Sequence, residues 1–398
     1  MVKDQFALLF RTVVLYGEGR LSGLGNLLQS LNASKVLVVT DRGITKSGIV
    51  EKSLNAIKSE HIDFVLFNEV ESNPTTYSVS KGLSLAKSET ISAIVAIGGG
   101  SSIDAAKAMN VLLANGGKVA DYRGFNRVGK KGLPLVAIPT TAGTGSEMTS
   151  FMLISDSETH QKIVCSDPRI IPDFAILDPT LTLSLPAPVT VSTGLDALSH
   201  SIESYVSKTA NPYSAVLSLQ ATQMITQNVL KVFEEPSNLD ARGQMLMAAN
   251  MAGLAVHLSY LGAAHSMANP LTAHCNLDHG LAVGMVLPFV MLFNARFQPQ
   301  KYKEIALALG TRIEGGEDDL AISRKGAMRL RNLLDKLSVP PNLVEMGVEE
   351  DLIPTMAQEA LTQLSLDYNP VKPDLQQMTK LFLAAVRGDP LLLMDGIH

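Results

Sequence analysis

The segment Ala93-Ile-Val-Ala-Ile-Gly-Gly-Gly-Ser-Ser-Ile-Asp-Ala-Ala-Lys107 decides the fold. An apolar run leads straight into three glycines and two serines, and helix-forming residues follow at once. This order is typical of a buried strand of a parallel sheet that turns directly into a helix. Glycines at such a turn let backbone N–H groups approach an anion, and a helix N-terminus favours negative charge. The turn therefore suits a pyrophosphate, and a purely structural tight turn is the alternative.

The segments around it repeat the same alternation. Apolar runs predict strands over residues 35–40, 63–67, 93–97 and 135–138, and helical patterns separate them over residues 45–60 and 75–88. Strands alternating with helices at this spacing predict a parallel sheet covered on both faces. Beyond residue 185 the pattern is helical over 194–206, 212–233, 239–257, 283–296, 301–309, 320–337, 350–361 and 374–387.

Pro186 and Pro188 mark the expected boundary between the two halves. We therefore predict an α/β dinucleotide-binding domain over residues 1–185 and an all-helical domain over residues 186–398, with a cleft between them. Ligands of open α/β sheets bind at the carboxyl ends of the strands, so the cofactor is expected there.

Composition excludes several classes of protein. With 46% apolar and 18% charged residues, the 398-residue chain is neither disordered nor of low complexity. Its net charge of −5 and the absence of a basic run exclude a nucleic-acid partner. Two cysteines fit a reducing cytoplasm, and the start of the chain lacks the pattern of a signal peptide. Residues 243–277 carry no charge, but their histidines and asparagines disfavour a membrane span; a buried helix followed by a catalytic loop is expected.

Two further groups of residues suit a dinucleotide. Asp41 follows the first clear strand, where a carboxylate can accept hydrogen bonds from ribose hydroxyls and repel a 2′-phosphate. That favours NAD over NADP, although a helix N-cap explains Asp41 equally well and the neighbouring Arg42 keeps NADP open. The segment Pro139-Thr-Thr-Ala-Gly-Thr-Gly-Ser146 is a second turn rich in hydroxyls and glycine that follows a strand.

A metal site is expected in the helical half. His265, His274 and His279 lie close together in a largely uncharged segment, and a divalent metal is one of the few partners that satisfies several buried imidazoles at once. Asp196 and His200 stand four residues apart, on one face of a helix. The residues alone predict a site made of these two and two of the three later histidines. Cys275 lies in the same segment and could also bind a metal, but the role of a buried apolar thiol is favoured for it.

Four motifs in register resemble the iron-containing (group III) alcohol dehydrogenases. They are Gly98-Gly-Gly-Ser101, Pro139-Thr-Thr-Ala-Gly-Thr-Gly-Ser-Glu147, Thr193-Gly-Leu-Asp-Ala-Leu-Ser-His-Ser-Ile-Glu-Ser-Tyr205 and the segment from His265 to His279-Gly280. The resemblance implies hydride transfer between NAD(P) and an alcohol/aldehyde or ketone pair, and a homodimer or larger homo-oligomer. It implies Fe²⁺, or else Zn²⁺, bound by Asp196, His200, His265 and His279. The cofactor would be lined by Asp41, Gly98, Gly99, Gly100, Ser101, Asp104, Thr140, Thr141, Thr144 and Lys162.

The chain departs from this family at the position four residues after the third ligand. Asn269 stands where members acting on simple alcohols commonly carry a histidine that helps to shuttle the proton. His274 and His257 are the candidates to replace it, each with a structural role as the alternative. Asp278 replaces a common proline and is expected to orient His279 or a cationic group. Short primary alcohols are therefore less certain substrates than the family name suggests, and a hydroxy acid, a hydroxylated phosphonate and a 1,3-diol are open options.

Two other activities compete with the dehydrogenase. A lyase resembling dehydroquinate synthase uses the same scaffold, NAD and a metal, but its polyanionic substrate needs several cationic side chains, which the uncharged stretch 243–277 does not offer. A scaffold that only binds nucleotide is disfavoured because all four ligand positions are filled. Turnover of an alcohol with NAD would distinguish the dehydrogenase from both.

Overall fold

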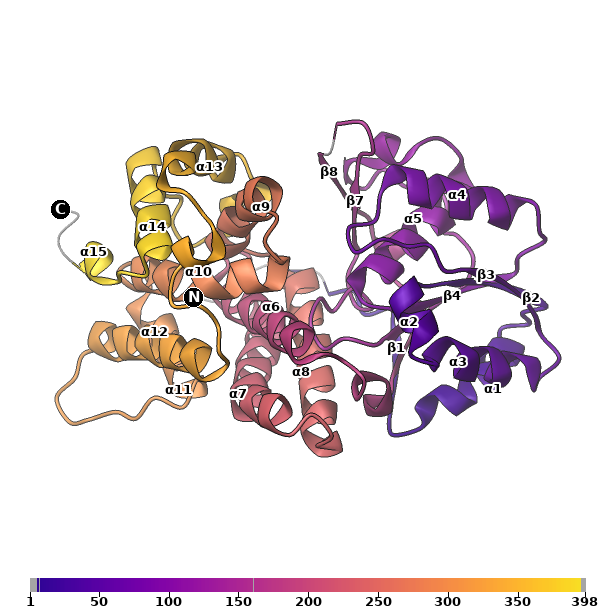
Figure 1. The fold of residues 1–398 in the computed structure, drawn as a ribbon, viewed down its shortest axis with the longest axis horizontal. Coiled ribbons are helices and arrows are strands. Elements are labelled where there is room, and N and C mark those ends of the chain that lie inside the picture. Colours follow the sequence, from indigo (N-terminus) through magenta and orange to yellow (C-terminus); the bar gives the residue numbers. More distant parts are fainter. Residues whose placement is uncertain (1–5, 7, 160, 395–398) are drawn as a thin grey trace. The chain divides into compact units, whose positions relative to one another are not determined.

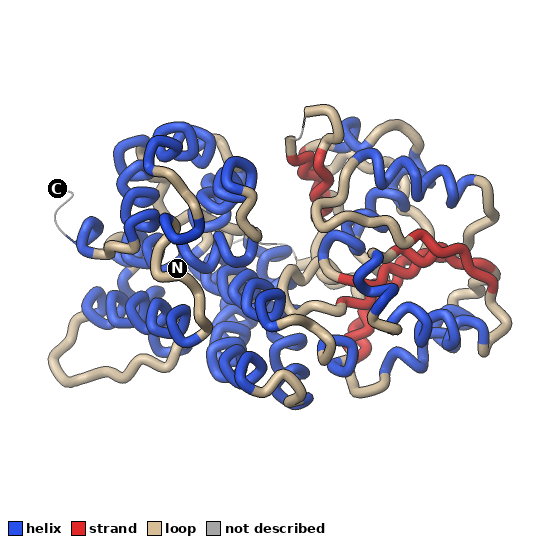
Figure 2. The backbone as a smooth tube through the Cα atoms, viewed as in Figure 1, coloured by secondary structure: helices blue, strands red, loops and turns tan. Residues whose placement is uncertain are grey.

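The computed structural model describes residue 6, residues 8–159 and residues 161–394 of the chain. Two compact units divide it, one spanning Leu9–Leu185 and the other beginning at Pro186. Phe6 belongs with the second unit, since its ring packs edge-on against Tyr213 at a centroid distance of 6.0 Å. The strands lie in the first unit, and the second consists of helices and loops (Figure 2).

The first unit is built on a six-stranded sheet whose neighbouring strands all run parallel. Its order is β1 (Val13–Tyr16), β9 (Phe174–Leu177), β6 (Leu135–Pro139), β4 (Ala93–Gly98), β2 (Lys35–Val39) and β3 (Asp63–Phe67). The four strands predicted from apolar runs are β2, β3, β4 and β6. The fold class is thereby confirmed, while the four-residue strands β1 and β9 were not predicted.

Helices cover both faces of this sheet (Figure 1). Alternate residues of β2 enter different cores, Leu37 with α4 (Thr76–Lys87) and α5 (Gly100–Asn115), Val38 with α1 (Leu24–Ser30) and α3 (Ile49–Lys58). The helix expected over residues 45–60 is instead two, α2 (Arg42–Lys46) and α3. Gly48 breaks it with a φ of 80°, in the left-handed region that glycine adopts without strain.

A second, smaller sheet was not predicted. It has the order β5 (Gly124–Phe125), β8 (Lys162–Ser166) and β7 (Phe151–Ser155), and β7 pairs antiparallel to β8. Short 3-10 turns complete the unit at η1 (Arg20–Gly23), η2 (Val119–Tyr122), η3 (Pro168–Ile170) and η4 (Pro179–Thr182).

The second unit is helical, as expected. Its helices are α6 (Ala187–Val206), α7 (Pro212–Glu234), α8 (Leu239–Ser259), α9 (Ala263–Cys275), α10 (His279–Ala295), α11 (Pro299–Ala308), α12 (Asp319–Lys336), α13 (Ile353–Leu361), α14 (Leu375–Arg387) and α15 (Leu391–Met394). The 3-10 turns η5 (Val344–Met346), η6 (Glu350–Leu352) and η7 (Leu364–Tyr368) lie between them. Most residues of α10 are buried, and it packs against α6, α9 and α12, so it is the central helix of the unit.

The prediction of a catalytic loop after α8 is wrong. Residues 263–275 form the helix α9, and His279 is the first residue of α10. Pro270 lies inside α9, where a proline normally disfavours a helix, and this made the segment resemble a loop. No single helix among the described residues is long and apolar enough to cross a membrane. In the described part of the chain one pair of helices, α8 and α9, meets those criteria together, and the pair is bent by 106°.

Candidate metal centre and dinucleotide site

The dinucleotide loops meet where the strand order of the sheet reverses. The chain passes from β2 outward to β3 and then returns to the other side of β2 as β4. The carboxyl ends of β2 and β4 therefore flank a topological switch point, the place where open α/β sheets bind ligands. Asp41 follows β2, and Gly98 ends β4. The sequence predicted both loops, but their adjacency follows from the strand order.

Close packing explains the glycines of the turn after β4. Gly98 has a φ of 148°, and a Cβ there would lie 2.5 Å from Ser102 Oγ. A Cβ on Gly100 would lie 2.8 Å from Thr144 Oγ1, which belongs to the loop after β6. Gly99, the N-cap of α5, offers no side chain to the first turn of that helix. The two loops thus pack together, and the first backbone N–H groups of α5 have no side-chain cap.

Three buried hydroxyls in this region have no hydrogen-bond partner among the described residues. They are Thr40 Oγ1 after β2, Ser102 Oγ in the first turn of α5 and Thr140 Oγ1 after β6. A buried hydroxyl without a partner is costly, so a polar ligand at the switch point would satisfy groups that the protein leaves unpaired. Thr140 was predicted, whereas Thr40 and Ser102 were missed. Both residues lie at the end of a strand or helix, next to residues that were predicted to bind the cofactor, and this position could have identified them.

Asp41 serves as the N-cap of α2. Its Oδ1 accepts a hydrogen bond of 2.9 Å from the backbone N–H of Ile44. Its Oδ2 would lie 3.4 Å from a Cβ on Gly98, so this oxygen faces the glycine turn. Arg42 forms an exposed ion pair of 3.6 Å with Glu69. Capping of α2 therefore engages Oδ1 of Asp41. A contact between Oδ2 and a ribose hydroxyl stays a prediction.

Three other predicted cofactor residues have partners within the protein. Ser101 donates through its hydroxyl to the carbonyl of Ser72, and Lys162 donates to Asn73 Oδ1 at 2.9 Å. Asp104 is buried, and its Oδ2 accepts from the backbone N–H of Leu153 at 2.9 Å. Burial raises the pKa of Asp104. The positive charge of buried Lys107, whose Nζ lies 3.8 Å from Asp104 Oδ1, lowers that pKa by a smaller amount. These contacts join α5 to the small sheet and to the loop before α4.

Asp196 and His200 lie on one face of α6, because residues four apart are neighbours on a helix. Nε2 of His200 is 3.5 Å from Oδ1 of Asp196. The same Oδ1 lies 3.6 Å from Nε2 of His265, which α9 supplies from its first turn. His279 is the first residue of α10, and its ring lies 5.5 Å from that of His265. Three helices therefore bring these four side chains together.

Asp196, His265 and His279 meet the spacing of a metal site. One ligand atom from each lies within 4.8 Å of the others. His200 adjoins this group, with its ring stacked on that of His265 at 4.9 Å. Together they offer one carboxylate and three imidazoles, donors that suit both Fe²⁺ and Zn²⁺.

The electrostatics of the cluster fit a cation. Burial alone would raise the pKa of Asp196, but the neighbouring imidazoles of His200, His265 and His279 outweigh it and hold that pKa well below its usual range. Burial alone would lower the pKa of His265, yet the nearby carboxylates of Glu203 and Asp196 raise it to about 9. Asp196 Oδ1 and His265 Nε2 are both buried, and neither has a hydrogen-bond partner among the described residues. A divalent ion bound to these atoms would satisfy both, so the residues present fit the metal.

Glu203 is a member of the site that the sequence analysis did not assign. It is buried in α6, seven residues after Asp196 and three after His200, and so shares their helix face. Its carboxylate contacts His265 Nδ1 at 2.5 Å. The spacing of four residues from Asp196 to His200 and of three more to Glu203 indicated a shared helix face. The sequence could not show that Glu203 contacts a residue of α9.

The three candidates for proton transfer lie in different surroundings. His274 is exposed near the end of α9, and its Nε2 lies 2.9 Å from Glu359 Oε2 of α13. Asn269 is half-buried one turn after His265, and its amide donates to Gln363 Oε1 at 2.9 Å. His257 is half-buried near the end of α8. Neither His257 nor His274 belongs to the group that Asp196, His265 and His279 form among the described residues.

Asp278, which was expected to orient His279 or a cationic group, is the N-cap of the helix that His279 begins. Its carboxylate caps α10 by accepting from the backbone N–H of Leu281 at 3.2 Å. The same Oδ1 hydrogen-bonds to the hydroxyl of Ser192 on α6. Asp278 therefore joins the start of α10 to α6, and it positions His279 through the backbone.

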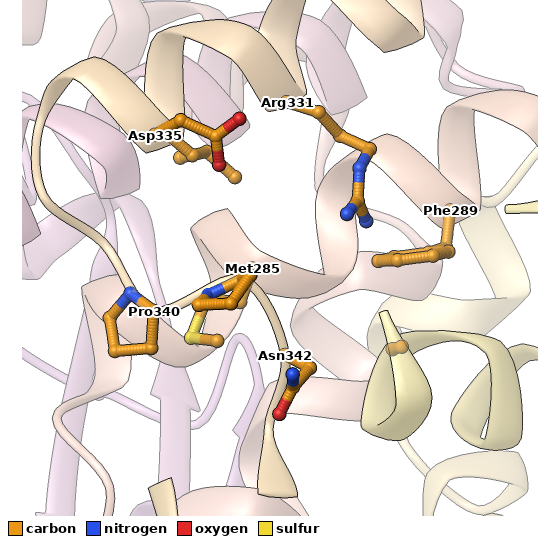
Figure 3. A pocket seen from close by; sticks show the side chains of 9 residues that line it. Met285, Phe289, Arg331, Asp335, Pro340 and Asn342 are labelled. Atoms are coloured by element: carbon orange, nitrogen blue, oxygen red, sulfur yellow. The ribbon is translucent and has the colours of Figure 1, made fainter. Parts of the chain in front are cut away.

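One pocket of the helical unit is separate from this cluster. Met285, Phe289, Arg331, Asp335, Pro340 and Asn342 are among its lining residues (Figure 3). Its volume of about 10 Å³ is enough for a single water molecule. It is too small to hold a substrate.

Comparison with known proteins identifies the family. Residues 11–179 match the family described as iron-containing alcohol dehydrogenase, and residues 190–386 match the C-terminal region of the same family. The NAD-dependent methanol dehydrogenase of Bacillus methanolicus is 35% identical over 370 residues, which cover 93% of this chain and 97% of that protein. The choline dehydrogenase of Bacillus subtilis is 37% identical over 365 residues, 90% of each chain. A crystal structure of 1,3-propanediol oxidoreductase superposes with a TM-score of 0.94 at 34% identity, covering 96% of this chain and all of that one.

The chain belongs to the iron-containing alcohol dehydrogenase family. It is a metal-dependent oxidoreductase that transfers a hydride between a nicotinamide dinucleotide and an alcohol/aldehyde or ketone pair. The resemblance seen in the motifs is thereby confirmed, and the lyase is not favoured.

Proposed function

We propose that this enzyme uses NAD and a divalent ion, with Fe²⁺ as the first choice, to interconvert a small polar alcohol and its aldehyde or ketone. The observation that carries the proposal is the buried cluster on α6, α9 and α10. In it, Asp196 Oδ1 and His265 Nε2 have no hydrogen-bond partner and lie 3.6 Å apart. Asp196, His200, His265 and His279 would hold the ion.

The metal, NAD and the protein side chains would each contribute a different part of the reaction. When bound, the metal would supply a positive charge that lowers the pKa of an alcohol substrate, and NAD would supply the hydride acceptor. Asp196 supplies the negative charge that keeps a cation in a buried site, and its low pKa keeps it ionised. The alcohol proton would leave through water or ribose hydroxyls, and His257 and His274 stay candidates for a histidine relay although neither belongs to the cluster.

NAD is favoured over NADP by Asp41. Its Oδ2 faces the glycine turn after β4, so a 2′-phosphate placed there would meet a negative charge. Arg42, the cation beside it, is engaged with Glu69. The backbone N–H groups of Gly100 and Ser101 at the start of α5 would face the pyrophosphate. Thr40, Ser102 and Thr140 offer it or the ribose their unpaired hydroxyls.

The substrate is expected to carry a second polar group. Asn269 and Gln363 form an uncharged amide pair one helical turn beyond His265. Amides can donate and accept hydrogen bonds but cannot titrate, so this pair suits recognition better than proton transfer. Similar proteins are named for methanol, choline and 1,3-propanediol, so their names do not select one substrate. A 1,3-diol, a hydroxy acid and a hydroxylated phosphonate fit the amide pair.

A turnover screen tests the proposal. Metal-free enzyme reloaded with Fe²⁺ or Zn²⁺ is assayed with NAD⁺ and NADP⁺ against methanol, 1-propanol, 1,3-propanediol, lactate and a hydroxyalkylphosphonate. We expect NAD⁺-linked oxidation, with a higher kcat/KM for a bifunctional alcohol than for 1-propanol. The Asp41→Gly variant should gain activity with NADP⁺ relative to NAD⁺. Absence of turnover with every alcohol and both metals would contradict the proposal, and a wild-type preference for NADP⁺ would contradict the role of Asp41.

We also infer that the enzyme works in the cytoplasm as a homodimer or larger homo-oligomer. Both cysteines are free, which fits a reducing compartment. Light scattering during size-exclusion chromatography would measure the oligomer, and a mass near the 42.6 kDa of one chain would contradict this inference.

A further inference from the structure

Glu203 makes two short contacts with consecutive residues of α9. Its Oε1 accepts a hydrogen bond of 2.6 Å from the backbone N–H of Ala264, and its Oε2 lies 2.5 Å from Nδ1 of His265. Both carboxylate oxygens are therefore engaged. Glu203 is 2% exposed, and in the part of the chain that the structure describes its only ion-pair partner is His265.

Burying a carboxylate is expensive, and a single partner rarely repays the loss of hydration. A helix cap alone does not explain the choice of glutamate here. Asn369, a neutral residue, accepts from the backbone N–H of Ala263 at 3.1 Å and so stabilises the same end of α9. Gly262 provides no side-chain cap to this helix. What Glu203 adds is its second oxygen, which reaches the imidazole.

The protonation of the two ring nitrogens of His265 follows from these contacts. A carboxylate can only accept, so Nδ1 must carry the hydrogen that faces Glu203. The other nitrogen, Nε2, then keeps its lone pair in the neutral ring, and it lies 3.6 Å from Asp196 Oδ1. A metal ligand needs that lone pair. Partners on the far nitrogen of ligating histidines commonly set the ring orientation in this way.

We propose that Glu203 is a positioning residue that fixes His265 in the tautomer and orientation required to bind the metal. This inference rests on the proposed metal site. It predicts a consequence of replacing the carboxylate with an amide of the same shape. The fixed N–H of Ala264 will take the amide oxygen, so the NH₂ of the new glutamine must face Nδ1. His265 must then accept at Nδ1 and carry its hydrogen on Nε2, where the metal should bind.

The test measures the affinity of metal-free, full-length enzyme for Zn²⁺ by competition with a chromogenic chelator. The absorption spectrum of the Co²⁺-loaded enzyme adds a report on coordination. We expect Glu203→Gln to bind Zn²⁺ about 10- to 100-fold more weakly than wild type. Glu203→Asp keeps two accepting oxygens on a shorter side chain and should bind better than Glu203→Gln. If Glu203 only fills space, the isosteric glutamine will instead be the milder change, and that order would overturn the inference.

Two matched controls separate positioning from general stability. Glu359→Gln makes the same change in the other carboxylate–histidine pair of α9, with exposed His274, and should leave Zn²⁺ affinity unchanged. Asn369→Ala removes the neighbouring cap of α9, so it should lower the Tm without a comparable loss of affinity. Equal losses in Asn369→Ala and Glu203→Gln would show that Glu203 acts only by holding the helix.

The same measurements distinguish this inference from the proposed site. Zn²⁺ binding that is as tight in His265→Ala as in wild type would contradict the site itself. Loss of binding in His265→Ala together with wild-type affinity in Glu203→Gln would leave the site standing and refute the role of Glu203. Circular dichroism of each metal-free variant establishes that it is folded before affinities are compared.

Discussion

At the scale of single residues, neighbouring histidines of one helix have different surroundings. His265 is buried with Glu203 on one nitrogen and Asp196 near the other. His274, nine residues later on α9, is exposed and paired with Glu359 of α13. Both have a carboxylate partner, but only His265 has a second nitrogen that faces a buried anion. The presence and spacing of histidines in the sequence therefore do not show which of them binds a metal.

The first prediction compares these histidines by metal content. Removing a ligand from a buried four-residue site should reduce metal binding severely, so His265→Ala and His279→Ala should purify with little iron or zinc. His274→Ala should retain the wild-type content, because its partner lies outside the cluster. Plasma emission spectrometry of the purified proteins gives the measurement. Metal lost from His274→Ala but kept in His265→Ala would contradict the ligand assignment.

The second prediction concerns the two thiols. Burial raises the pKa of Cys165 to about 12, and it also raises the pKa of Cys275, which is only half-buried at the end of α9. Because the thiolate is the reactive form and the fraction of thiolate falls as the pKa rises, Cys165 should resist alkylation throughout pH 7–10. Cys275 should react in the native protein, and faster as the pH increases. Mass spectrometry after iodoacetamide treatment checks both.

The unfolded chain provides the reference for the cysteine experiment. In denaturant both thiols should alkylate at similar rates, and Cys165→Ser should show the same native labelling as wild type. Labelling of native Cys165 as fast as that of Cys275 would show that β8 opens readily, contrary to the buried position of Cys165.

At the scale of elements, α6 supplies Asp196 and His200 to the candidate metal centre, and α10 approaches α6 very closely. A Cβ on Gly280 would lie 2.3 Å from the backbone oxygen of Ser192 in α6. The hydroxyl of Ser192 also hydrogen-bonds to Asp278, the N-cap of α10. His279 lies between Asp278 and Gly280, the two residues of α10 and its cap that contact Ser192. The close approach of the two helices therefore determines where this imidazole lies relative to Asp196.

The third prediction is that Gly280→Ala separates these helices. A backbone atom cannot move aside as a flexible side chain can, so the added methyl should destabilise the protein by about 1–3 kcal/mol. It should also weaken Zn²⁺ binding, because His279 moves with α10. Thermal unfolding and chelator competition measure the two effects. Gly315→Ala is the control, since a Cβ there meets nothing within 4 Å. Wild-type affinity in Gly280→Ala would show that the metal centre tolerates movement of α10.

At the scale of the whole molecule, the two kinds of chemistry belong to different units. The loops expected to bind NAD lie in Leu9–Leu185, and the four expected metal ligands lie in the unit that begins at Pro186. A ligand stabilises the part of a protein to which it binds, by about 2.7 kcal/mol when present at one hundred times its Kd. Each ligand should therefore leave its own pattern of protection.

The fourth prediction follows for hydrogen–deuterium exchange of the metal-free enzyme. Zn²⁺ should give its largest gain in protection in α6, α9 and the start of α10. NAD⁺ should give its largest gain at the turn from β4 into α5, at the start of α2 and in the loop after β6. Peptide-level mass spectrometry compares the two. A Zn²⁺ response concentrated in the β4–α5 turn, with none in α9, would contradict the placement of the metal site.

Much of this organisation could be predicted because it depends on residues close together in the chain. Apolar runs predicted β2, β3, β4 and β6, and spacing placed Asp196 beside His200 on a helix. The strands β1 and β9 and the small three-stranded sheet were missed, because a short apolar run can form a strand or a loop and only its pairing in the fold decides. The helix α9 was mistaken for a loop because Pro270 lowers helix propensity, and tertiary packing overrides it.

The sequence by itself determined the fold class, the family and the kinds of side chain available for the chemistry, because motifs and local patterns encode these. Only the tertiary structure decided which residues meet. It brought β2 and β4 together at the switch point, joined Asp196 to His265 and His279, and paired His274 with Glu359. It also placed Glu203 against His265, 62 residues away in the chain. Such contacts depend on how whole helices pack, and no local pattern records that.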